Sequence, residues 1–198
     1  MELFYNTTSP FARKCSMVLH LNGLINETEL VLTNPFDDAY KNTNPLGKVP
    51  ALVDGDLTLF DSPLMCEYLD DTSVANGGLT LLHKNTPHYY PIQQIHSQAD
   101  GILDAAVSTL FETRRETEQS DYWMSRWHSA IKTGVGTLPM DKLGNVAQPN
   151  MGTVATIAAL GYLDFRMAHY GWRDWNAALA EWYANCQDAS WVEATLPK

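Results

Sequence analysis

Cysteine is scarce in this sequence of 198 residues. The three cysteines are an odd number and form no CxxC pair: Cys15, Cys66 and Cys186. A disulfide framework or a cysteine zinc site is therefore not expected, and a reducing, cytoplasmic compartment fits better.

Long apolar runs and an excess of positive charge are also missing. No stretch approaches the roughly 18 apolar residues that a spanning helix needs, and the opening MELFYNTTSP lacks the pattern of a signal peptide. The formal net charge is -10, which repels phosphate backbones and anionic membrane surfaces. His83, His88 and His96 are not spaced like a metal site. We expect a soluble protein that binds no metal, nucleic acid or membrane.

The first part of the chain has the pattern of an α/β domain. Residues 2–5 and 28–32 are strand-like, and the segment between them has apolar residues at helical spacing. Ser9 is a good helix N-cap, Pro10 suits the first helical position, and Gly23 marks the end. Cys15 lies on the apolar side of this helix, so we expect it to be buried.

A loop, a hairpin and a second helix complete this part. Residues 34–46 read as a loop with a short helix around 36–40, and residues 51–53 and 57–60 flank a turn signal at 54–56. Ser62-Pro63 opens a helix to about Asp71. Beyond it the pattern is helical, with expected helices at 87–114, 121–133, 153–169 and 174–187. The expected organisation is a domain at 1–75, a linker at 76–86 and an all-helical domain at 87–198.

Four local features in this order resemble the glutathione transferase family. They are SPFARKC at 9–15, NPLGKVPAL at 44–52, DS at 61–62 and ALGYLDFR at 159–166. The resemblance is greatest to bacterial-type members that use a serine or cysteine. It implies a thioredoxin-like N-terminal domain, an all-α C-terminal domain, a homodimer, and glutathione as co-substrate.

Ser9 is the candidate for activating the thiol of glutathione. It lies between a strand end and a helix start, where free N–H groups and the helix dipole favour an anion such as a thiolate. Ser9 would donate a hydrogen bond and keep its proton. Thr8 and Tyr5 are alternative donors, and an N-cap serine is also often only a cap. A dithiol exchange enzyme is not expected, because Ser9 and Ala12 occupy the positions of the two redox cysteines.

Two further motifs suit the ends of the tripeptide. The resemblance implies a cis Val49-Pro50 bond, with the Val49 backbone pairing with the cysteinyl part of glutathione. Asp61 suits the γ-glutamyl ammonium, and Ser62 with the following helix N-terminus suits the carboxylate. The donor to the glycyl carboxylate is Lys48, Lys41 or Asn34.

The helical part carries the remaining expectations. The electrophile pocket is expected to include Tyr5, Phe11, Leu110, Phe111 and Arg114, which could equally be core or solvated surface. Asp100 is a candidate for reaching glutathione across a dimer interface. The family has a Ser/Thr-x-x-Asp capping box where this chain has threonine at position 156, so we expect a weakened helix start.

The resemblance predicts a cytoplasmic glutathione transferase, acting in detoxification, that joins glutathione to a small hydrophobic electrophile. Two alternatives stay open. One is a non-catalytic relative that serves in protein interaction or regulation, and the other is a glutathione-dependent isomerase or thiol transferase.

Overall fold

The computed structural model describes all 198 residues and divides the chain into two compact units. The first unit contains Met1–Leu82 together with Ser190–Lys198, and the helical unit contains His83–Ala189. The sequence-based prediction instead placed residues 190–198 in the all-helical domain. They belong to the first unit because the short helix α7 (Ser190–Glu193) packs on α1, with Trp191 and Val192 buried.

A four-stranded sheet forms the centre of the first unit. Its strands are β1 (Glu2–Tyr5), β2 (Glu29–Leu32), β3 (Ala51–Asp54) and β4 (Leu57–Leu59), in the order β2-β1-β3-β4. β1 and β2 are parallel, as a strand-helix-strand crossover requires, whereas β3 is antiparallel to both β1 and β4. The expected hairpin and crossover are both present.

Two helices pack together in the first unit. Helix α1 (Pro10–Leu21) begins as predicted, because the Ser9 side chain accepts a hydrogen bond from the Ala12 N–H at 3.2 Å. Helix α2 (Ser62–Ala75) begins at Ser62, but its N-cap is Asp61 rather than Ser62, and it ends four residues later than expected. Cys15 of α1 is fully buried, as predicted, with its Sγ 3.8 Å from that of Cys66 in α2.

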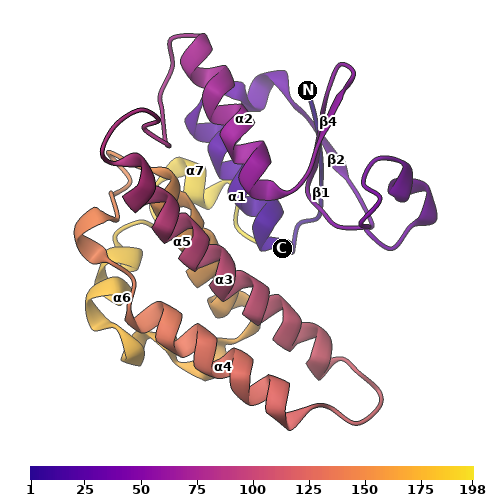
Figure 1. Cartoon of the computed structure of the whole chain (residues 1–198), viewed down its shortest axis with the longest axis vertical. Helices are drawn as coiled ribbons and strands as arrows, with labels where there is room; N and C mark the ends of the chain where they lie inside the picture. Colours follow the sequence, from indigo (N-terminus) through magenta and orange to yellow (C-terminus); the bar gives the residue numbers. More distant parts are fainter. The chain divides into compact units, whose positions relative to one another are not determined.

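Short 3₁₀ helices complete the first unit. They are η1 (Leu24–Glu27) and η2 (Asp38–Asn42), the second lying two residues beyond the helix expected at 36–40. The rings of Phe4 in β1 and Tyr40 in η2 are 6.1 Å apart. Figure 1 shows η2 and its loop on the side of the sheet away from α1 and α2.

The helical unit is built around a buried central helix. Its helices are α3 (Tyr89–Thr113), α4 (Asp121–Gly136), α5 (Met151–Arg166) and α6 (Ala177–Ala184), with 3₁₀ helices η3 (Met140–Lys142), η4 (Ala168–Tyr170) and η5 (Trp172–Trp175). Every residue of α5 from Met151 to Leu163 is buried. At Gly152 a Cβ would lie 2.9 Å from Ile95 of α3, so a glycine is needed for this close approach. The single helix expected at 174–187 is instead divided between η5 and α6.

The prediction that the start of α5 is weakened is wrong. The helix begins at Met151, and its N-cap is Asn150, whose Oδ1 accepts from the Thr153 N–H at 3.0 Å. The Asn150 N–H donates in return to Thr153 Oγ1 at 3.1 Å. The capping box is therefore complete one turn earlier than the family pattern suggests, and it needs no acid at Thr156.

Candidate functional site

The register of the sheet brings three chain segments to one edge. Phe4, near the end of β1, pairs with Ala51 at the start of β3, and Leu52 pairs with Leu59 at the end of β4. The end of β1, the start of β3 and the end of β4 therefore lie at the same edge of the sheet. The loops joined to these three strand ends meet there. These segments carry the predicted glutathione-binding motifs, all of which belong to the first unit.

Ser9 and Val49 are in contact at this edge. The Ser9 hydroxyl donates to the Val49 carbonyl oxygen at 3.4 Å, and the Val49-Pro50 peptide bond is cis, as the resemblance implied. The Val49 N–H donates no hydrogen bond within the chain. Val49 therefore retains a backbone donor that an extended ligand could use.

Two residues that the sequence reasoning did not single out hold the segment before Val49. The Tyr40 hydroxyl and the Asn44 side-chain amide both donate to the Lys48 carbonyl oxygen, at 2.8 and 2.7 Å. Burial raises the pKa of Tyr40 to about 12, so its hydroxyl keeps its proton and remains a donor. A sequence signal for Asn44 existed, because Asn before Pro45-Leu46-Gly47 is typical of a turn.

The three hydroxyl candidates differ in how firmly they are held. Thr8 Oγ1 donates to Asn6 Oδ1 at 2.8 Å, which is a short and well-formed bond. The Ser9 bond to Val49 is long, so little free energy is lost when its hydrogen turns to another acceptor. The Tyr5 hydroxyl forms no hydrogen bond within the chain. Ser9 and Tyr5, but not Thr8, have a donor available for a ligand.

The start of α2 contains an unsatisfied buried hydroxyl. Ser62 is fully buried, and its Oγ has no hydrogen-bond partner. The neighbouring Asp61 is exposed, and its carboxylate accepts from the Ser62 N–H. Unpaired buried polar atoms are rare and need an explanation. Of the N–H groups in the first turn, that of Ser62 donates to Asp61, Pro63 has none, and that of Leu64 is free. A hydroxyl beside a free N–H at a helix start fits a carboxylate ligand.

The three candidate donors for the glycyl carboxylate are not equivalent. Lys41 forms an ion pair with Asp38 at 2.7 Å, and the Asn34 amide donates to Asp37 at 2.8 Å. Lys48 is exposed, and its ammonium forms no ion pair within the chain. Lys48 is thus the only one of the three whose donor is uncommitted.

The predicted electrophile pocket draws on both units. Tyr5 and Phe11 are half-buried in the first unit, whereas Leu110, Phe111 and Arg114 lie at the end of α3 in the helical unit. That these five residues form one electrophile pocket stays a prediction. Asp100 in α3 lies 3.3 Å from Nε2 of the buried His96, and its expected role across a dimer interface also stays a prediction.

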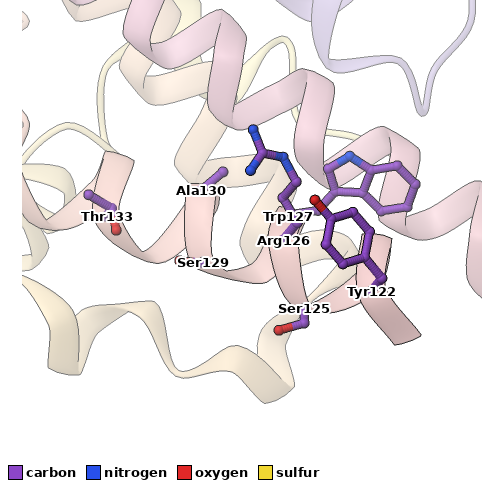
Figure 2. A pocket seen from close by; sticks show the side chains of 7 residues that line it. All are labelled: Tyr122, Ser125, Arg126, Trp127, Ser129, Ala130 and Thr133. Carbon is purple, nitrogen blue, oxygen red and sulfur yellow. The ribbon is translucent and has the colours of Figure 1, made fainter. Parts of the chain in front are cut away.

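A surface hollow on α4 was not anticipated. It has a volume of about 550 Å³ and is lined by Tyr122, Ser125, Arg126, Trp127, Ser129, Ala130 and Thr133. Figure 2 shows that all of these side chains come from this one helix. The hollow is shallow and lies in the helical unit, so it contains none of the predicted glutathione-binding residues.

None of the helices combines the length and the apolar character that a membrane span requires.

A family model and individual relatives both match this chain, and both indicate the family that the sequence motifs resemble. The sequence model of the family "Glutathione S-transferase, N-terminal domain" matches residues 8–72. The chain is 34% identical over 178 residues to YibF of Escherichia coli (strain K12), described as an uncharacterized GST-like protein; the match covers 87% of this chain and 86% of that protein. It is 38% identical over 165 residues to a stringent starvation protein A homolog of Pasteurella multocida (strain Pm70), covering 73% of this chain and 76% of that one.

A solved structure is similar along the whole chain. It is a glutathione transferase family member from Pseudomonas fluorescens Pf-5 with bound glutathione, with a TM-score of 0.91 and 30% identity, covering 100% of this chain and 98% of that one. The fold is therefore the predicted one, a thioredoxin-like α/β part and an all-helical part. The chain belongs to the glutathione S-transferase family.

Proposed function

We propose that this protein is a glutathione transferase of the serine-dependent kind, with Ser9 stabilising the thiolate of bound glutathione. The observation that carries the proposal is the buried, unpartnered Ser62 hydroxyl at the start of α2, on the sheet edge that also holds Ser9 and Val49. The glutathione in the similar structure from Pseudomonas fluorescens Pf-5 supports it.

The residues at this edge match the chemistry of glutathione from end to end. The Ser62 hydroxyl and the Leu64 N–H at the start of α2 suit the γ-glutamyl carboxylate, and the Asp61 carboxylate suits the ammonium on the same carbon. The backbone N–H and C=O of Val49 suit the cysteinyl part, which lies in glutathione as a short extended segment. Lys48 suits the glycyl carboxylate because Lys41 and Asn34 already have acidic partners.

The chain's own groups are sufficient to stabilise the thiolate. Lowering a thiol pKa by two units requires about 2.7 kcal/mol. A helix N-terminus contributes about 0.3–2 kcal/mol, and a hydrogen bond to a charged group about 1.5–3 kcal/mol. Ser9 donates that hydrogen bond and keeps its own proton, while the thiol proton passes to solvent. The thiolate then attacks the electrophile, and holding both substrates in one site supplies much of the rate.

The Thr8 and Tyr5 hydroxyls are the alternatives to Ser9. Thr8 is the weaker of the two, because its hydrogen is committed to Asn6. We further propose a cytoplasmic homodimer that acts in detoxification on a small electrophile, with the pocket formed by Tyr5, Phe11, Leu110, Phe111 and Arg114.

A non-catalytic role is the second candidate function. It is favoured by the likeness to a stringent starvation protein A homolog, a name that states no enzyme activity. A glutathione-dependent isomerase or thiol transferase would use the same binding edge with a different outcome.

Retention on immobilised glutathione and turnover of chlorodinitrobenzene separate these functions. A transferase is retained, is eluted by free glutathione, and forms the conjugate. Retention without conjugation leaves the isomerase and the thiol transferase. A folded protein that is not retained contradicts glutathione binding and favours the interaction protein. The Ser62→Ala variant removes only the hydroxyl assigned to the γ-glutamyl carboxylate and should weaken retention.

A further inference from the structure

The carbonyl oxygen of Lys48 is held by two buried side chains of the first unit. The Tyr40 hydroxyl donates to this oxygen at 2.8 Å and the Asn44 side-chain amide donates to it at 2.7 Å. Both distances are those of well-formed hydrogen bonds. Tyr40 is 6% exposed and Asn44 is 1% exposed. A carbonyl oxygen has two lone pairs, so this acceptor is fully used within the chain.

The two donors are themselves fixed by the surrounding chain. The Asn44 N–H donates to the Tyr40 carbonyl oxygen at 3.0 Å, and the Asn44 carbonyl oxygen accepts from the Gly47 N–H at 2.9 Å. The side-chain oxygen of Asn44 accepts from the Leu46 N–H at 3.0 Å. The Tyr40 ring lies 6.1 Å from the ring of Phe4 in β1. Both donors therefore keep their positions whether or not a ligand is bound.

This hold sets the direction of the next backbone N–H. The Lys48 carbonyl and the Val49 N–H belong to one planar peptide unit, which is trans, so the two bonds point in opposite directions. Because Tyr40 and Asn44 hold the oxygen, the Val49 N–H points away from them. It donates no hydrogen bond within the chain. The next residue, Pro50, has no N–H to offer a ligand.

A fixed peptide unit is a better partner for a ligand than a freely rotating one. If this unit could turn about its flanking dihedral angles, a ligand that accepts from the Val49 N–H would have to order it, at a cost in affinity. The two hydrogen bonds to the Lys48 oxygen remove that cost. They also polarise the amide, which strengthens its N–H as a donor.

We propose that Tyr40 and Asn44 are positioning residues for glutathione, which hold the Lys48 carbonyl so that the Val49 N–H donates to the cysteinyl carbonyl oxygen of the ligand. Both act through the backbone of Lys48 and Val49. This assignment rests on the glutathione binding of the proposed function, but it does not require the transferase activity. It makes the cysteinyl carbonyl a group that the site selects for.

A matched pair of ligands tests this selection. γ-Glutamylcysteinamide keeps the cysteinyl carbonyl and γ-glutamylcysteamine lacks it, while neither has the glycyl carboxylate assigned to Lys48. Each is titrated against the isotope-labelled full chain, and the backbone amide signals give the Kd. We expect wild type to bind the cysteinamide about five- to tenfold more tightly. Only this ligand should move the Val49 amide proton downfield, as a new hydrogen bond does.

Tyr40→Phe is the decisive variant, because it keeps the buried ring and removes one hydroxyl. It should reduce the preference for the cysteinamide to about twofold or less and shrink the Val49 shift. Asn44→Ala should do the same, although it also leaves the Leu46 N–H without its partner. Tyr68→Phe is the matched control: its hydroxyl donates to Asp54 at 2.6 Å, at the far end of β3 from Val49. It should keep the full preference.

A ratio of two affinities separates positioning from a general loosening of the site. A preference that is lost in Tyr40→Phe and kept in Tyr68→Phe supports the proposal. If Tyr40→Phe weakens both ligands equally or weakens neither, or if wild type shows no preference, the proposal is overturned. The transferase proposal fails separately: wild type that shows the expected preference but forms no conjugate contradicts the transferase alone. Normal conjugation with an unchanged preference in Tyr40→Phe contradicts the positioning role alone.

Discussion

Replacing Ser9 by alanine removes the hydroxyl that hydrogen-bonds the start of α1 to Val49. In the wild-type chain, the Ser9 hydroxyl accepts from the Ala12 N–H at 3.2 Å and donates to the Val49 carbonyl at 3.4 Å. If Ser9 stabilises the thiolate, the variant should still bind glutathione through Val49, Asp61 and Ser62. Its bound thiol should be a weaker acid, because one donor to the charged sulfur is lost.

The size of the effect follows from that one hydrogen bond. A hydrogen bond to a charged group contributes about 1.5–3 kcal/mol, which corresponds to a rise of about 1–2 units in the pKa of the bound thiol. The N-terminus of α1 is unchanged and keeps its own contribution. At neutral pH, kcat/KM should fall about ten- to a hundredfold, and the midpoint of its pH profile should move upward by the same 1–2 units.

The assay is ultraviolet difference absorbance of the thiolate, titrated with pH in the binary complex with glutathione. Ser9→Thr keeps a hydroxyl and an N-cap and should restore much of the acidity, whereas Ser9→Ala also loses about 0.5–2 kcal/mol of cap stability. Thr8→Val and Tyr5→Phe are the matched controls. A thiol pKa unchanged in Ser9→Ala but raised in one of these two would refute the assignment of Ser9 and transfer the role to that hydroxyl.

Three further predictions concern the edges of the site and the fold. Lys48→Gln should raise the Kd for glutathione, measured by calorimetry, about two- to fivefold, as expected for the loss of an exposed ion pair. Lys41→Gln should leave the Kd unchanged. The reverse result would assign the glycyl carboxylate to Lys41 instead. Asn150→Ala should lower the free energy of unfolding by about 0.5–2 kcal/mol and Tm by about 1–8 °C, whereas Asn150→Ser should recover most of the loss. A Tm equal to the wild type in Asn150→Ala would show that the capping box is dispensable. Burial raises the pKa of Cys186 from 9.0 to about 11, so the stability contributed by its protonated thiol is complete below pH 9 and declines toward pH 11. Denaturant unfolding across that range should show a decline that Cys186→Ala reduces, and an equal decline in both proteins would contradict this role.

Most of the first unit could be predicted because its signals are local. Ser9-Pro10 fixes the start of α1, Asp54-Gly55-Asp56 fixes the hairpin, and both features are written within a few residues of where they act. The helical unit was harder, since α5 is buried on all sides and has no amphipathic pattern to mark its first turn. A sequence motif from the family then placed its start at Thr153, although Asn150 is the residue that caps it. The assignment of residues 190–198 to the first unit depends on long-range contacts, which no local pattern reports.

The ranking of the candidate hydrogen-bond donors to the glycyl carboxylate and to the thiol, by contrast, could have been found in the sequence. Lys41 follows Asp38 by three residues, and Asn34 precedes Asp37 by three, so each has an acid at a spacing that short helices and turns bring into contact. Thr8 likewise follows Asn6 by two residues, the spacing of an Asx turn. Lys48 has no such local partner. The Ser9 hydroxyl accepts from the Ala12 N–H but has no local acceptor for its own hydrogen, so in the structure both residues keep a donor for a ligand. Where several residues of suitable chemistry compete for one role, the residue without a local partner is the better candidate, because binding the ligand then breaks no strong existing bond.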